Sequence, residues 1–68
     1  MAKLPQFEIC DHPTSANHCL VKARYRGRVY AISWALPISS PDIEEVKRIW
    51  LEERGAFRPY DESGARYL

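Results

Sequence analysis

Apolar and polar residues alternate along three stretches in the first half of the chain, with the period of two that is typical of β-strands. The stretches cover residues 7–10, 18–25 and 28–36. A period of two places every second side chain on the same face of a sheet. The pattern therefore predicts three strands, and Arg26 and Gly27 form the two-residue turn between the second and the third.

This turn decides which residues of the second and third predicted strands lie opposite each other. It pairs Tyr25 with Arg28, and the same register continues as Ala23–Tyr30, Val21–Ile32 and Cys19–Trp34. These residues form the predicted core face of the hairpin. The other face carries Leu20, Lys22, Arg24, Val29, Ala31, Ser33 and Ala35. A slip of one residue would exchange the two faces, so the assignment depends on this register.

After residue 38 the apolar period lengthens to about 3.6 residues, as in an amphipathic helix. The apolar stripe consists of Ile43, Val46 and Trp50, with Trp50 at its centre. Ser39 or Ser40 suits the N-cap position, and Pro41 suits the first turn. We expect the helix to run to about Arg54 and to stop at Gly55.

These elements predict a small two-layer α+β domain of order β-β-β-α, with a three-stranded antiparallel sheet and one helix on one face. Sixty-eight residues make a single domain of marginal stability. We expect residues 1–6 to be an N-terminal arm, 7–57 the folded core with Phe57 docked on it, and 58–68 an irregular tail. The second face of the sheet stays open unless the tail, a second copy or a partner covers it.

The formal net charge of +1 argues against a uniformly basic nucleic-acid coat, but the charge is unevenly divided. Five cations against two carboxylates give residues 1–38 a charge of +3, and five against seven give residues 39–68 a charge of −2. The segment MAKLPQF lacks the apolar run of a signal peptide, and we see no membrane-spanning stretch. The sequence therefore predicts a cytoplasmic protein with no membrane partner.

Cations gather on the predicted hairpin, where Tyr25 interrupts a run of Lys22, Arg24, Arg26 and Arg28. Arginine suits contacts to phosphate and guanine, and a tyrosine can stack on a base. A three-stranded sheet with one helix and a basic outer face resembles the amino-terminal arm-binding domains of phage-type integrases. That resemblance implies DNA contact through the sheet. The alternative is a solvated face whose cations discourage pairing with other sheets.

Two cysteines and two histidines flank the loop that follows the first predicted strand. Cys10, His12, His18 and Cys19 have ligand chemistry suited to zinc, but their spacing is poor. His18 and Cys19 are adjacent on a strand and should point to opposite faces. We therefore expect no metal and no cofactor.

A disulfide between Cys10 and Cys19 is a further alternative. The apolar pattern asks instead for Ile9 opposite Cys19 and Phe7 opposite Val21, so the disulfide would need a bulge. Two free thiols are expected in a reducing compartment. No nucleophile elbow, phosphate loop or metalloprotease motif is present, which indicates a protein that is not an enzyme.

The sequence thus favours a non-enzymatic binding protein that occupies the surface of a protein or nucleoprotein partner. Small chains without catalytic motifs include phage and mobile-element inhibitors of host machinery, anti-CRISPR proteins among them. The expected contact residues are Lys22, Arg24, Tyr25, Arg26, Arg28, Tyr60 and Tyr67. The alternative is a small DNA- or RNA-binding module that uses the basic hairpin. A third reading is self-association through the open face, and the oligomeric state is not predicted.

Overall fold

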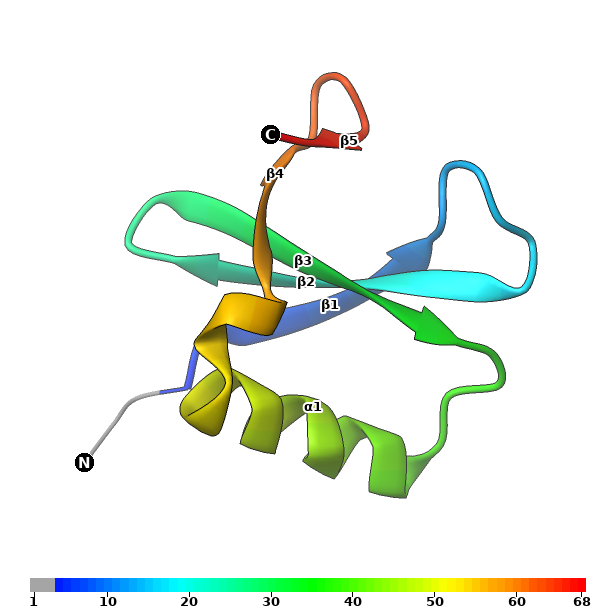
Figure 1. The fold of residues 1–68 in the computed structure, drawn as a ribbon, viewed down its shortest axis with the longest axis vertical. Coiled ribbons are helices and arrows are strands. Elements are labelled where there is room, and N and C mark those ends of the chain that lie inside the picture. The colour runs from blue at the N-terminus through cyan, green and yellow to red at the C-terminus, as the bar shows by residue number, and fades with distance from the viewer. Residues whose placement is uncertain (1–3) are drawn as a thin grey trace.

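A computed structural model describes residues 4–68, which form five strands and one α-helix (Figure 1). In chain order these are β1 (Gln6–Asp11), β2 (His18–Tyr25), β3 (Arg28–Ala35), α1 (Ser40–Glu52), the 3₁₀ turn η1 (Arg54–Ala56), β4 (Arg58–Asp61) and β5 (Arg66–Tyr67). Residues 1–3 of the expected arm lie outside the described residues. The α+β class is confirmed. The three-stranded sheet and the irregular tail are wrong, because the tail forms β4 and β5.

The hairpin of β2 and β3 has the predicted register over its whole length. Tyr25 lies opposite Arg28, and Cys19 lies opposite Trp34 at the far end. Arg26 and Gly27 both have positive φ angles, of 52° and 76°. Positive φ at both central residues is the requirement of a type I′ turn, whose twist matches that of the two strands.

β1 pairs with β2 two residues away from the predicted register. Ile9 lies opposite Val21 and Phe7 opposite Ala23. A shift of two residues leaves every side chain on its predicted face, so the apolar pattern does not distinguish the two registers. The observed register brings the Phe7 ring to 6.2 Å from the ring centroids of both Trp50 and Phe57.

The start of α1 is the predicted one, and its end is two residues early. Ser39 is the N-cap, and its backbone N–H donates to the Asp42 carboxylate at 2.9 Å. This hydrogen bond lowers the pKa of Asp42. The helix ends at Glu52 instead of Arg54, and Gly55 lies within η1 instead of acting as the stop residue. The Arg54 Nε donates to the Trp50 carbonyl at 3.0 Å and satisfies one of the last carbonyls of the helix.

The main core lies between α1 and the inner face of the sheet, with Trp50 at its centre. Trp50 is 0% exposed. Four aromatic rings pack edge-to-face with it: those of Phe7, Tyr25, Tyr30 and Phe57. Phe57 is buried, as predicted. The indole N–H of Trp50 has no acceptor within the described residues, so the ring is held by its packing contacts and not by a hydrogen bond.

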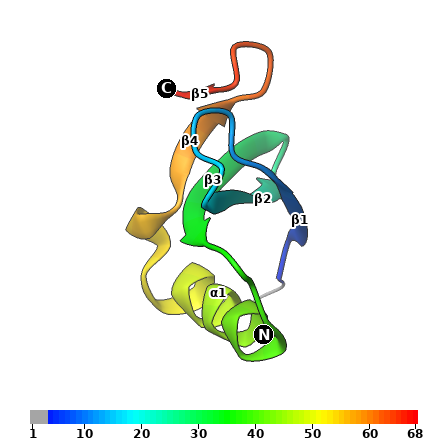
Figure 2. The same ribbon diagram turned by 90° about the vertical axis from the view of Figure 1, so that its right-hand side faces the viewer.

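The second face of the sheet is covered by the C-terminal hairpin of β4 and β5. Figures 1 and 2 show the hairpin of β2 and β3 lying between α1 and this C-terminal hairpin. β4 pairs with β3, with Arg58 opposite Ala31, and the chain then curls over the outer face. Leu20, Ala31 and Tyr60 form a second buried cluster there. The tail is therefore the covering that the sequence left undetermined.

None of the helical segments in residues 4–68 has the length and apolar character needed to cross a membrane.

Replacing Trp50 with alanine is expected to lower the free energy of unfolding by about 3–5 kcal/mol, because it removes the centre of the core. Leu51→Ala is the matched control. Leu51 is next to Trp50 on the same helix but is 50% exposed, so its loss should cost less than about 1 kcal/mol. Urea denaturation followed by circular dichroism measures both. Equal losses in the two variants would contradict the core assignment.

Arg26→Asn is expected to leave the midpoint of thermal unfolding equal or slightly higher, because asparagine tolerates the left-handed conformation better than arginine. Gly27→Ala is the contrasting variant. A Cβ atom at Gly27 would meet no neighbouring atom within 4 Å, so its cost should come from the positive φ angle, at about 1–2 kcal/mol. A destabilising Arg26→Asn with a neutral Gly27→Ala would show that the turn is not type I′.

Candidate functional site at the hairpin turn

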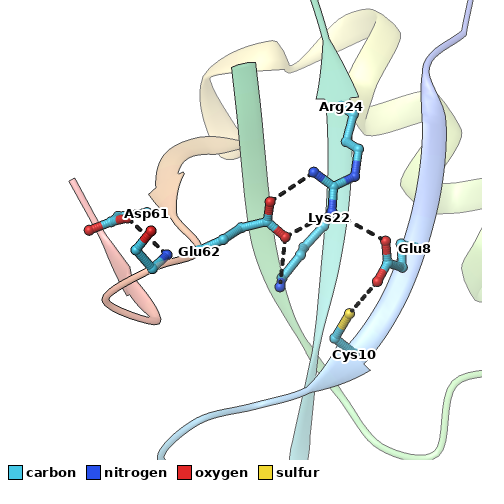
Figure 3. Close-up of polar contacts among 7 residues, drawn as sticks. Glu8, Cys10, Lys22, Arg24, Asp61 and Glu62 are labelled. Atoms are coloured by element: carbon cyan, nitrogen blue, oxygen red, sulfur yellow. Dashed lines mark hydrogen bonds and ion pairs between the residues drawn. The ribbon is translucent and has the colours of Figure 1, made fainter. Parts of the chain in front are cut away.

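Two of the hairpin cations are engaged by a carboxylate of the C-terminal hairpin. Figure 3 shows Glu62 reaching from the turn after β4 to Lys22 and Arg24 on β2. The Arg24 guanidinium donates to both oxygens of Glu62, at 2.7 and 2.8 Å. Lys22 Nζ donates to the same carboxylate at 3.3 Å. Arg24 also lies 3.6 Å from the Glu8 carboxylate on β1.

This pairing ties Lys22 and Arg24 to the C-terminal hairpin, and the Arg24 side chain stays 49% exposed. The Lys22 side chain is only 14% exposed and its Nζ lies 5.3 Å from the centroid of the Tyr60 ring. The hydrogen bonds from Arg24 lower the pKa of Glu62, so this carboxylate is held in its charged form. A phosphate approaching this face would have to compete with a bidentate carboxylate already in place.

The two tyrosines expected as contact residues of the tail pack the C-terminal hairpin on the sheet. Tyr60 is buried against Leu20 and Ala31. Tyr67 is half-buried, and its ring packs edge-on against Tyr60 with a centroid separation of 5.4 Å. The Tyr67 hydroxyl lies 3.2 Å from the Ser33 Oγ. Both rings therefore have a structural role that accounts for their burial.

Arginines gather around Tyr25 at the turn of the β2–β3 hairpin. The guanidinium of Arg26 lies 5.2 Å from the centroid of the Tyr25 ring, and that of Arg54 lies 5.0 Å from it. Arg54 is also 3.8 Å from the Trp50 ring. Arg28 lies opposite Tyr25 in the ladder and is exposed. We call Arg26, Arg28 and Arg54 the arginine cluster.

Within residues 4–68 no carboxylate forms an ion pair with a member of the arginine cluster. Stacking on aromatic rings restricts the side chains of Arg26 and Arg54. The Arg54 Nε already donates to the Trp50 carbonyl, but the remaining guanidinium N–H groups of the cluster have no carboxylate partner and suit contacts to carboxylate or phosphate. The cluster can therefore bind an anionic group with little loss of side-chain entropy.

A groove of about 280 Å³ adjoins Arg28 of the arginine cluster, between β3 and the C-terminal segment. It is lined by Arg28, Val29, Tyr30, Pro59, Tyr60 and Leu68. Its floor is mostly apolar, and Arg28 supplies a cation at its rim. The hairpin turn thus offers a charged contact and an apolar contact side by side, which is the combination found in many protein interfaces.

The cysteines and histidines do not converge on one site. Cys10 and Cys19 are free thiols on opposite faces of the sheet. Burial raises the pKa of both thiols, and a hydrogen bond to Glu8 adds to the effect at Cys10. The His12 Nδ1 accepts hydrogen bonds from the backbone N–H groups of Thr14 and Ser15. In the described part of the chain, no three metal-ligating side chains are grouped.

Sequence reasoning missed Arg54 and Glu62. Arg54 is the residue at which the predicted helix ends; in the structure it begins η1, and its guanidinium lies 5.0 Å from the centroid of the Tyr25 ring. For Glu62 a signal was present, because the opposite charges of the two halves indicate attraction between the tail and the hairpin. The sequence did not specify which carboxylate would meet which cation.

The comparisons with known proteins identify no relative of this chain. No protein-family profile matches it, and neither a curated protein nor a solved structure is significantly similar to it.

Glu62→Gln is expected to loosen the C-terminal hairpin without unfolding the core. The substitution keeps the shape of the side chain but removes the charge that pairs with Lys22 and Arg24. Amide hydrogen exchange in residues 58–67 should become several-fold faster, while exchange in β2 stays unchanged. Glu44→Gln is the control, because it removes an equal charge from α1 on the other side of the sheet.

The same variant gives a pH test with a definite sign. The pKa of Glu62 is lowered in the folded protein, so its stabilising effect is fully present above the ordinary glutamate value of about 4.3. The effect is lost as the pH falls through the lowered value. Exchange rates of wild type and Glu62→Gln should therefore differ at pH 6 and converge at strongly acidic pH. A difference that grows on acidification would contradict the ion pair.

Proposed function

We propose that this protein is a non-enzymatic binding protein that occupies an acidic surface of a protein or nucleoprotein partner. The arginine cluster and the adjoining groove make the contact. Binding of this kind blocks whatever the covered surface does, which is how small phage and mobile-element proteins, anti-CRISPR proteins among them, inhibit host machinery. The protein acts as such an inhibitor.

The observation that carries the proposal is the lack of an internal carboxylate partner for Arg26, Arg28 and Arg54 in residues 4–68. The same structure pairs Lys22 and Arg24 with Glu62 and pairs Arg48 with three glutamates of α1 and its C-cap. Arg58 and Arg66 also form no ion pair in the described residues, but the arginines at the hairpin turn are the ones that gather around Tyr25 and adjoin the groove. Arginine is also the charged residue most enriched at protein interfaces and their hot spots.

The environment of the cysteines favours binding over catalysis. A nucleophilic cysteine needs a lowered pKa, and the pKa values of Cys10 and Cys19 are both raised. His12 is occupied by backbone N–H groups of its own loop. The raised pKa values of the thiols and the hydrogen bonds to His12 support a structural role for these side chains.

Nucleic-acid binding through the same arginines is the second candidate. Arg26 and Arg28 stand at the turn of a hairpin, where they can reach phosphates or a groove. The cations farther along the hairpin, Lys22 and Arg24, are held by Glu62, which shortens the basic track to the turn. A net charge of +1 adds little long-range attraction. These points favour a protein surface.

The experiment is an affinity capture from lysate of the native host, with the tag at the N-terminus so that the groove beside Leu68 stays open. Wild type is compared with a double variant, Arg28→Gln with Arg54→Gln. The captures are run with and without nuclease, at low and moderate salt. We expect a discrete protein complex that survives nuclease and is lost with the double variant.

Arg48→Gln is the matched control, because it removes a cation that α1 and its C-cap already pair with Glu45, Glu52 and Glu53. It should capture the same complex as wild type. Recovery of nucleic acid alone, lost as salt rises, would support the second candidate. Capture that is indifferent to the arginine cluster would reject both.

A further inference from the structure

β1 is an edge strand whose outer side meets no other strand in residues 4–68. The strand order is β1-β2-β3-β4-β5, and Figure 2 shows β1 at one margin of the sheet. Edge strands are usually protected by lysine, by proline or by a covering segment. The six residues of β1, QFEICD, contain neither lysine nor proline. The edge therefore presents main-chain N–H and C=O groups that can pair with an added strand.

An apolar groove runs between this edge and α1. It has a volume of about 110 Å³ and is lined by Phe7, Ile9, Val21, Ile38, Ile43 and Val46. Ile9 is 47% exposed and Ile43 is 38% exposed, so both could bury further surface against a partner. Apolar cavities of about 150 Å³ hold a benzene molecule. The groove is thus of a size to take one aliphatic side chain.

The two elements that form the groove are both acidic. β1 carries Glu8 and Asp11 and no cation; Arg24 of β2 lies 3.6 Å from the Glu8 carboxylate, whereas Asp11 forms no ion pair in residues 4–68. In α1 four carboxylates face two cations, which leaves a formal charge of −2. Asp42 sits in the first turn and offsets the positive end of the helix dipole near the groove. A cationic segment is therefore complementary to this edge.

A second copy of the chain fits the same edge poorly. Antiparallel pairing of β1 with another β1 would bring the carboxylates of two strands together, and Arg24 of β2 offsets Glu8 but not Asp11. The main-chain groups of the edge would accept either a second copy of the chain or a cationic peptide, and the negative charge of the edge favours the cationic peptide.

We propose that the β1 edge binds an extended peptide segment of a partner protein as an additional strand. The segment alternates apolar and basic residues. One aliphatic side chain enters the groove between Ile9 and Ile43, and lysines or arginines flank it. This site lies on β1 and α1 and does not use the arginine cluster, so it stands or falls independently of the function proposed above.

The probe is a fluorescein-labelled peptide, Lys-Val-Lys-Leu-Lys-Val, and its binding is followed by fluorescence anisotropy. Wild-type protein should bind it saturably below about 1 mM. The charge-reversed peptide Glu-Val-Glu-Leu-Glu-Val should bind at least about tenfold more weakly. A version of the first peptide with N-methylated alternate residues should lose binding, because it lacks the donors that a strand needs.

The variant pair is Ile43→Gln and Leu51→Gln. Both residues are partly exposed on α1, but only Ile43 lines the groove. Ile43→Gln should weaken binding by about tenfold, as expected for loss of an apolar contact with one side chain. Leu51→Gln should have no effect, and thermal unfolding of both variants checks the fold.

Three outcomes would overturn the proposal. The first is no saturable binding by wild type, and the second is equal binding of both charge forms. The third is a concentration-dependent dimer in sedimentation equilibrium that Ile43→Gln abolishes, since a second copy would then be the occupant.

Discussion

The register of the β2–β3 hairpin is the constraint on which the rest of the structure depends. Both faces of this hairpin are buried, one under α1 and the other under the hairpin of β4 and β5. A slip of one residue would send Cys19, Val21 and Ala23 to the wrong side and break both clusters at once. The type I′ turn at Arg26-Gly27 prevents such a slip locally, and the two buried clusters reinforce it from either side.

The C-terminal hairpin covers the face of the sheet that a single helix would leave exposed. It adds a second apolar cluster centred on Leu20, Ala31 and Tyr60. It also brings Glu62 to the cations of β2. Because small domains bury a low fraction of their surface, covering the second face is a substantial gain. The same step ties Lys22 and Arg24 to the C-terminal hairpin.

Two surfaces of the described residues differ in the sign of their formal charge. The arginine cluster at the hairpin turn has stacking partners but no carboxylate within residues 4–68. The edge formed by β1 and α1 has excess carboxylates beside an apolar groove. Two surfaces of opposite charge suit recognition of partner surfaces that also differ in charge. In the binding function proposed above, complementary charge would contribute to specificity and to the rate of association.

The sequence by itself determined the local features. Alternation defined the strand faces, Arg26-Gly27 defined the hairpin register, and Ser39 defined the start of the helix, because each depends on neighbouring residues only. The tertiary structure decided the rest. The β1 register needed the contacts of Phe7 with Trp50 and Phe57, since shifts of two residues are equivalent by pattern. The fold of the tail depends on contacts of Tyr60 and Glu62 with residues about 30 to 40 positions earlier in the chain. These contacts also decide which partners Lys22 and Arg24 have. Such long-range contacts leave no periodic trace in the sequence of so short a segment.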